Sequence, residues 1–214
     1  MRIKLCGFTN KTSIEFALKY KPNFIGFIFY PPSKRNITLN QAKEFSKIDF
    51  GKSKKIAVIV NEEDDNIKKI IDNLQPELLQ LHGEENIARC QDIKNKFQLP
   101  IIKSIAIANN SSPIETQIEI DNYQKIANFL LFDTKTIQKG GSGTNFNWDI
   151  LKKLNLPKEY FLSGGIDINN VKEALNISNN IILDLSSGIE ERKGVKSLDK
   201  IKNLMILFNK LKKT

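Results

Sequence analysis

Two side chains suited to acid–base chemistry, the thiol of Cys6 and the carboxyl group of Asp133, each stand at the end of a short segment of strand length. Cys6 ends the run Ile3–Cys6, in which apolar and polar residues alternate as in a strand with two different faces. Asp133 ends the run Phe129–Asp133. A thiol in such a place is either a reactive group or a small apolar side chain that fills a gap. The carboxyl group is a candidate general acid, a helix cap or an ion-pair partner of a lysine.

Eight apolar runs of strand length alternate with eight segments of helical period. The predicted strands are Ile3–Cys6, Phe24–Phe29, Lys55–Val60, Leu78–Leu81, Ile101–Ser104, Phe129–Asp133, Tyr160–Ser163 and Ile181–Leu185. The predicted helices are Asn10–Tyr20, Thr38–Lys47, Glu63–Leu74, Glu84–Phe97, Pro113–Ala127, Trp148–Leu154, Ile168–Leu175 and Leu198–Lys212.

This alternation predicts an α/β protein with parallel strands. Eight units in 214 residues favour a closed (β/α)8 TIM barrel. An open doubly wound sheet is the alternative, but it normally carries a G-x-G-x-x-G turn after its first strand, and Cys6-Gly7-Phe8-Thr9 is no such turn. No composition break marks a boundary, so we expect residues 1–214 to form one catalytic barrel domain.

Barrel enzymes build their active sites at the carboxyl ends of the strands. Cys6 and Asp133 both fall at such ends, which favours the catalytic interpretation of Asp133. Glycine-containing turns follow the seventh and eighth strands, where many barrels bind phosphate. A single turn of this kind would indicate only a tight bend, but two at adjacent strand ends favour a phosphate site. Its candidate residues are Gly164, Gly165, Ser186, Ser187 and Gly188.

Composition excludes several classes of protein. His82 is the only histidine, which argues against a histidine metal site or a Ser-His-Asp triad. Cys6 and Cys90 are too few for a disulfide framework and lack metal-ligand spacing, and we expect Cys90 to be a core residue. The net charge of +9 comes from lysines scattered along the chain, which predicts solvated helix faces and no nucleic-acid partner. No apolar run reaches the ~20 residues of a membrane span, and no signal-peptide pattern is present, so a cytoplasmic protein is expected.

In addition, nine short segments in order resemble the phosphoribosylanthranilate isomerase family of tryptophan biosynthesis. They are Lys4–Gly7, Gly26–Tyr30, Ser33–Arg35, Val58–Asn61, Leu79–Gly83, Leu131–Thr134, Gly140–Thr144, Ser163–Gly165 and Asp184–Glu190. The family usually carries a lysine near the position of Thr144 or Asn145, so this chain departs from the pattern there. The resemblance covers nearly the whole sequence and implies the same barrel fold.

The resemblance also implies an activity and its residues. Members convert N-(5-phosphoribosyl)anthranilate into its 1-deoxyribulose isomer by an Amadori rearrangement, without a metal or organic cofactor. By resemblance, Cys6 would be the general base, Asp133 the general acid, and Arg35 the partner of the anthranilate carboxylate. The glycine turns would hold the phosphate. The implied partner is therefore a phosphorylated small molecule, and the chain is expected to be a monomer or a homodimer.

Some interpretations remain open at the level of sequence. Arg35 is either a substrate ligand or a solvated loop charge, and His82 either a substrate contact or a structural histidine. Lys4 shares the face of Cys6, and the parity of Asp184 on the neighbouring eighth strand predicts a buried Lys4–Asp184 ion pair.

Four other functions of barrel proteins fit the residues present less well. A metal-dependent epimerase would need histidine ligands, a histidine-pathway isomerase an aspartate in place of Cys6, and an indoleglycerol-phosphate synthase an additional lysine and glutamate. A barrel that only binds a phosphate ligand would need neither Cys6 nor Asp133.

Overall fold

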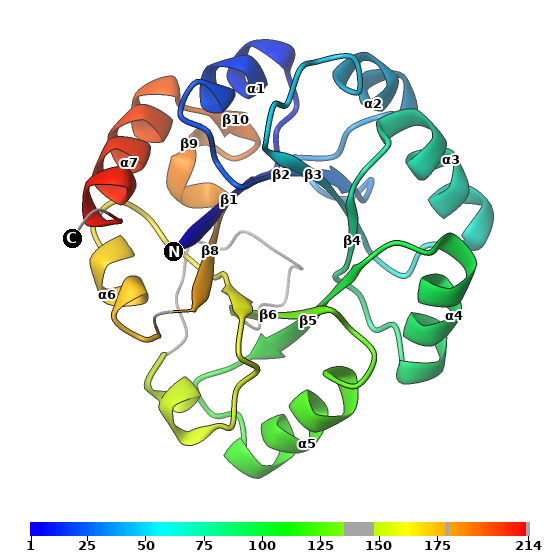
Figure 1. Ribbon diagram of the computed structural model, residues 1–214, viewed down its shortest axis with the longest axis vertical. Helices are drawn as coiled ribbons and strands as arrows, with labels where there is room; N and C mark the ends of the chain where they lie inside the picture. Colours follow the sequence, from blue (N-terminus) through cyan, green and yellow to red (C-terminus); the bar gives the residue numbers. More distant parts are fainter. Residues whose placement is uncertain (135–147, 179, 213–214) are drawn as a thin grey trace.

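The chain forms a closed barrel of eight parallel strands, in the order β1 to β8, with β8 paired to β1. The computed structural model describes residues 1–134, 148–178 and 180–212. Figure 1 looks into the ring of strands, with the helices outside it. The strands are β1 (Arg2–Cys6), β2 (Phe24–Phe29), β3 (Lys54–Ile59), β4 (Leu78–Leu81), β5 (Ile101–Ile107), β6 (Phe129–Thr134), β7 (Tyr160–Leu162) and β8 (Ile181–Leu185). The predicted (β/α)8 barrel is confirmed.

The helices cover the outside of the barrel and begin mostly at polar caps. They are α1 (Lys11–Leu18), α2 (Leu39–Phe45), α3 (Asp64–Leu74), α4 (Ile87–Phe97), α5 (Pro113–Tyr123), α6 (Val171–Leu175) and α7 (Leu198–Leu211). Side chains of Asn10, Thr38, Asn86, Ser112 and Ser197 accept backbone hydrogen bonds at the starts of α1, α2, α4, α5 and α7.

Several bounds differ from the sequence prediction, as in β5, which continues to Ile107 and not only to Ser104, and two segments differ in type. The segment expected as the helix Trp148–Leu154 is a 3-10 helix, η1 (Trp148–Lys153). It has only six residues before the Asn155 amide donates to Gln117 of α5, and so short a segment gains little from α-helical hydrogen bonding. After β8 the chain forms a short 3-10 helix, η2 (Ser187–Ile189), and an antiparallel hairpin of β9 (Glu190–Arg192) and β10 (Val195–Lys196). This hairpin was not predicted.

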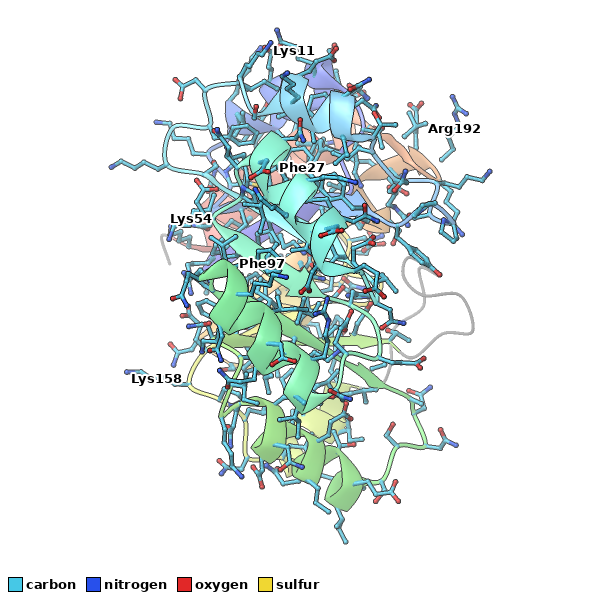
Figure 2. All side chains as sticks on the ribbon, turned by 90° about the vertical axis from the view of Figure 1, so that its right-hand side faces the viewer. Lys11, Phe27, Lys54, Phe97, Lys158 and Arg192 are labelled. Atoms are coloured by element: carbon cyan, nitrogen blue, oxygen red, sulfur yellow. The ribbon has the colours of Figure 1, made fainter. Side chains whose placement is uncertain are left out.

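The two ends of the barrel are distinct. In Figure 2, Lys54 at the start of β3 and Lys158 before β7 lie at one edge, and Arg192 of the β9–β10 hairpin lies at the opposite, carboxyl edge. Near the amino end, the Arg2 guanidinium lies over the Phe24 and Phe129 rings and pairs with Glu159. Among the described residues, none of the helices is both long and apolar enough to cross a membrane.

Successive residues of each strand point alternately into the barrel and outward to the helices, so the side chains form two apolar clusters. An inner cluster, which includes Cys6, Val58 and Ile182, packs inside the strands around Phe24 and Phe161. A larger cluster packs between the strands and the surrounding helices. The inner positions nearer the carboxyl ends are polar, and these polar positions build the site.

Candidate active site

Cys6 lies at the carboxyl end of β1 with a buried, free thiol. Gly26 on β2 leaves the space it needs: a Cβ atom there would lie 2.5 Å from Cys6 Sγ and 2.9 Å from Lys4 Cε. Burial raises the pKa of the Cys6 thiol, although the positive charges of Lys4 and Lys196 act in the opposite direction. The thiol therefore needs added positive charge nearby to become a thiolate at neutral pH.

The predicted ion pair between the first and last strands is confirmed. Lys4 Nζ lies 2.8 Å from Asp184 Oδ2, and both side chains are buried. Lys4 Nζ also donates to Gln80 Oε1 on β4. Burial disfavours the Lys4 ammonium, but the charges of Asp184 and Cys6 outweigh this cost and raise the pKa of Lys4. The pair thus fixes the Lys4 ammonium close to the thiol, while the charge of its partner Asp184 acts to raise the pKa of Cys6.

Asp133 stands at the carboxyl end of β6, three strands from Cys6 around the barrel. Its Oδ1 accepts a hydrogen bond from the Thr134 amide at 2.9 Å, and its Oδ2 lies 3.3 Å from His82 Nε2. The Nδ1 of His82 lies 3.0 Å from Gln80 Nε2. Among the residues that the structure describes, Asp133 is therefore held at the site by a histidine and not by a lysine, the partner that the alternative interpretation supposed.

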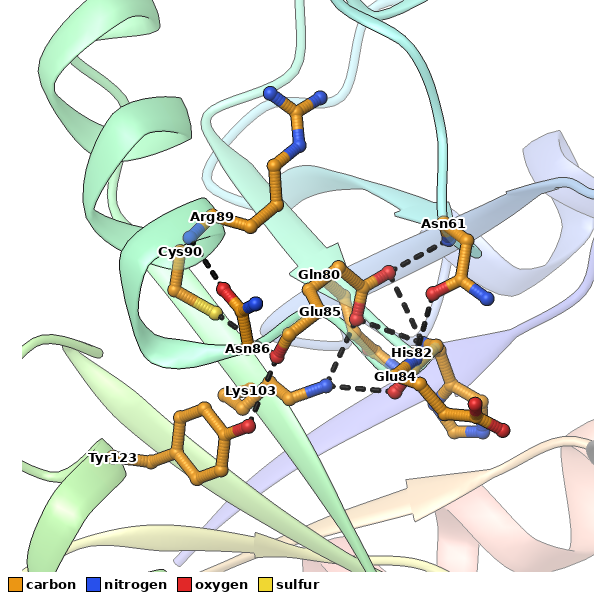
Figure 3. Close-up of polar contacts among 11 residues, drawn as sticks. Asn61, Gln80, His82, Glu84, Glu85, Asn86, Arg89, Cys90, Lys103 and Tyr123 are labelled. Carbon is orange, nitrogen blue, oxygen red and sulfur yellow. Dashed lines mark hydrogen bonds and ion pairs between the residues drawn. The ribbon is translucent and has the colours of Figure 1, made fainter.

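A buried ion pair holds the loop that carries His82 (Figure 3). Lys103 Nζ on β5 donates to Glu85 Oε2 and to the Gly83 carbonyl oxygen, each at 2.8 Å. Glu85 in turn accepts hydrogen bonds from the amides of Asn61 at 2.8 Å and Gly83 at 3.0 Å. Burial raises the pKa of Glu85, but Lys103 outweighs it and holds that pKa below its ordinary value.

This loop network was missed in the sequence. A lysine in the middle of the apolar run Ile101–Ile107 was the available signal, since a buried charge needs a partner. Cys90, predicted to be a core residue, is fully buried on α4 beside this network, and burial raises its pKa to about 11.

Arg35, in the loop after β2, is buried and not a solvated loop charge. Its Nε and Nη2 donate to Glu190 Oε1 and Oε2 at 2.7 and 2.8 Å. Lys196 Nζ donates to the same carboxylate at 2.8 Å. Burial disfavours the guanidinium, but the Glu190 bonds raise the pKa of Arg35. The Nη1 group takes no part in the two Glu190 bonds.

The side chain of Arg35 packs against Gly7, the residue that follows Cys6. Gly7 has a φ of +79°, and a Cβ there would lie 2.6 Å from Arg35 Cδ. Only glycine fits that backbone and that contact. Glu190 and Lys196, which fix the guanidinium, belong to the hairpin that the sequence did not predict.

The two glycine turns, predicted to bind phosphate, make close backbone contacts with neighbouring segments. Gly164 and Gly165 have φ angles of +92° and +62°. A Cβ at Gly164 would lie 2.2 Å from Thr134 Oγ1, and one at Gly188 would lie 2.0 Å from the Ile166 carbonyl oxygen. The turns after β7 and β8 thus form one continuous surface of close backbone.

Further polar groups surround the turns. Ser186 precedes η2, Ser187 and Gly188 begin it, and Lys196 Nζ donates to the Ser186 carbonyl oxygen at 3.0 Å. The Gly140–Thr144 segment lies outside the described residues. Within the described part of the chain, no three His, Cys, Asp or Glu side chains gather in a way that could hold a metal ion.

A closed parallel barrel with a thiol, a carboxyl group and two adjoining glycine turns at its carboxyl ends is typical of the (β/α)8 enzymes, which frequently bind phosphate at the turns after the seventh and eighth strands. Residues 3–206 match the family model for N-(5'phosphoribosyl)anthranilate (PRA) isomerase. The chain belongs to this family and is an isomerase of tryptophan biosynthesis.

Individual relatives agree with this membership. The chain is 35% identical over 207 residues to the N-(5'-phosphoribosyl)anthranilate isomerase of Bradyrhizobium sp. (strain ORS 278), covering 95% of this chain and 93% of that protein. It is similar to the phosphoribosyl anthranilate isomerase structure from Thermus thermophilus, with a TM-score of 0.85, 27% identity and coverage of 99% and 100% of the two chains. A second structure, in complex with reduced 1-(o-carboxyphenylamino)-1-deoxyribulose 5-phosphate, has a TM-score of 0.79, 28% identity and 96% coverage of each chain.

Proposed function

We propose that Cys6 is the general base and Asp133 the general acid in the conversion of N-(5-phosphoribosyl)anthranilate into 1-(2-carboxyphenylamino)-1-deoxyribulose 5-phosphate. The observation that carries this assignment is their common placement. Both side chains stand at carboxyl ends of strands that are three positions apart in the closed barrel. An acid and a base on separate strands can reach different atoms of one sugar.

The reaction needs both groups in turn. Protonation of the furanose ring oxygen by Asp133 opens the ring and gives an iminium ion. Removal of the C2′ proton by Cys6 then gives an enolamine, which becomes the ketone. The iminium ion brings a positive charge toward the buried thiol, and together with Lys4 and Lys196 it favours the thiolate. Ring opening therefore prepares the base for its step.

The remaining predicted residues bind the two ends of the substrate. Arg35 Nη1, the guanidinium nitrogen outside the two Glu190 bonds, is assigned to the anthranilate carboxylate. His82, at the same rim, is assigned to the substrate as well as to Asp133. Gly164, Gly165, Ser186, Ser187 and Gly188 are assigned to the phosphate, which backbone amides in tight turns suit. That a related structure holds a phosphorylated ligand of this type supports these roles.

The setting of the enzyme follows from the same reasoning. We infer one catalytic domain over residues 1–214, acting in the cytoplasm without a nucleic-acid partner. The chain is a monomer or a homodimer, and one similar structure is described as monomers generated from the dimeric enzyme of Thermotoga maritima.

The test is to replace each group separately and follow turnover by the loss of substrate fluorescence. Cys6→Ser and Asp133→Asn should each lower kcat by about 10²- to 10⁴-fold, the usual contribution of a positioned acid or base. Far-UV circular dichroism and the urea midpoint should stay close to those of the parent chain. Cys90→Ser is the matched control, since it removes the other buried thiol away from the substrate. Near-normal turnover of both variants would contradict the assignment.

A further inference from the structure

Gln80 lies buried on β4 between the charged centre beneath the thiol and the histidine that holds the acid. Its Oε1 accepts from Lys4 Nζ, and its Nε2 lies 3.0 Å from His82 Nδ1. His82 Nε2 then lies 3.3 Å from Asp133 Oδ2. These contacts form a continuous chain from β1 to β6, and Figure 3 shows Gln80 and His82 at the end of β4.

The donor and acceptor properties of these groups allow one arrangement of protons. An ammonium group has only donors, so Lys4 requires the carbonyl oxygen of the Gln80 amide on its side. The amide nitrogen, which also only donates, must then face His82. His82 Nδ1 must accept that hydrogen bond and so carries no proton. A neutral imidazole has a single N–H, and it is therefore on Nε2, which faces Asp133.

We propose that Gln80 is a positioning residue that sets the tautomer of His82, so that His82 Nε2–H donates to the acid Asp133. The proposal rests on the role of Asp133 proposed above. An N–H at Nδ1 would place a second donor against the Gln80 amide N–H, so the 3.0 Å contact matches a bare Nδ1. Among the described residues, the charged groups that face these contacts are Lys4 on β1, Asp133 on β6 and Asp184 on β8.

The consequence for Asp133 is a fixed carboxyl plane. Its Oδ1 is held by the Thr134 amide and its Oδ2 by the histidine. Each carboxyl oxygen keeps a further lone-pair position, which can carry the proton delivered to the ring oxygen. Without the Gln80 contact the imidazole could turn its unprotonated nitrogen toward Asp133, and the hydrogen bond would be lost.

The single histidine makes the test direct. In protein labelled with ¹⁵N at histidine, two-bond ¹H–¹⁵N correlation spectra at neutral pH should show a neutral ring with a protonated Nε2 and a bare Nδ1. Gln80→Glu keeps an acceptor for Lys4 but places an acceptor against Nδ1. It should move the proton to Nδ1 or produce the imidazolium, and should lower kcat by about 10- to 100-fold with a smaller change in KM. Gln75→Glu, at an exposed position, is the control with the same charge change.

The spectrum of the unmodified protein decides the matter even if the variant fails to fold. An Nδ1–H tautomer or an imidazolium at neutral pH in that protein would overturn the proposal. So would an unchanged tautomer in folded Gln80→Glu. Failure of the proposed function is separate, because it would show as normal turnover of Asp133→Asn and would leave the histidine spectrum of the parent chain as expected.

Discussion

Replacing Lys4 with methionine should destabilise the barrel by about 3–5 kcal/mol at pH 7. The change leaves the buried Asp184 carboxylate without its ion-pair partner at 2.8 Å and removes a donor to Gln80. Burial already raises the pKa of Asp184, so the lone carboxyl group will take up a proton in the folded state. The unfolded chain has an Asp184 pKa of ~3.9, so keeping this carboxyl group protonated in the folded state at pH 7 costs about 4 kcal/mol. This cost is the upper limit of the stability lost through the unpaired charge.

The sign of the pH dependence distinguishes this cause from lost packing. In Lys4→Met the folded pKa of Asp184 lies above its unfolded value, so the folded state binds the proton more tightly. The deficit relative to the parent chain should therefore shrink as the pH falls from 7, by about 1.4 kcal/mol per pH unit, until the pH reaches the pKa that Asp184 has in the parent chain, which burial holds above its ordinary value. Urea unfolding at pH 7 and pH 5, followed by circular dichroism, measures both values.

Two further variants complete the experiment. Lys4→Met with Asp184→Leu removes both charges and should recover much of the loss, because a buried ion pair is often replaceable by apolar side chains. Lys69→Met, at an exposed position on α3, should change stability by about 0.5 kcal/mol or less. A pH-independent deficit, or one of about 1 kcal/mol at pH 7, would refute the reasoning.

Two other predictions concern the thiol and the loop after β4. Gly26→Ala places a methyl group 2.5 Å from Cys6 Sγ and should lower kcat by about 10²-fold through displacement of the base, with binding little changed; steady-state kinetics test this, and an unaltered kcat would show that the thiol has room to move. Glu85→Gln leaves Lys103 buried without its counter-ion and should cost about 3–5 kcal/mol at pH 7. Because the folded pKa of Glu85 is lowered, its stabilisation is present above its ordinary pKa of 4.5 and is lost as the pH falls through the folded value, so the variant should approach the parent chain in acid. Urea midpoints that stay equally far apart at pH 7 and pH 3 would argue against an ionic role.

The fold was predictable because each element repeats one local pattern. The bounds of β2, β4 and β8 match the apolar runs to the residue. The β9–β10 hairpin was not predictable in this way, because Glu190–Lys196 has neither an apolar run nor strand alternation. The hairpin is held in place by Glu190, which binds Arg35. Arg35 lies in the loop after β2, 155 residues away in sequence.

The site was predictable where strand parity decides the direction of a side chain. Parity placed Lys4 beside Asp184, and the structure confirms the contact. The link from Gln80 through His82 to Asp133 depends on side-chain reach across three strands, β4, β6 and β1. Periodicity carries no information about such reach, so Gln80 was not singled out in the sequence.

The Lys4–Asp184 pair also joins segments that are 180 residues apart in sequence. Contacts of such separation form late, since the intervening chain must close first. During synthesis, β1 is made before β8. Until β8 has formed, burial of the Lys4 ammonium group without its partner is unfavourable. Because an unpaired ammonium group is costly to bury, β1 is stabilised inside the barrel only when Asp184 of β8 pairs with Lys4. Cys6, the proposed base, lies on the same strand as Lys4 and therefore acquires its final surroundings only when β8, the last strand of the barrel, is in place.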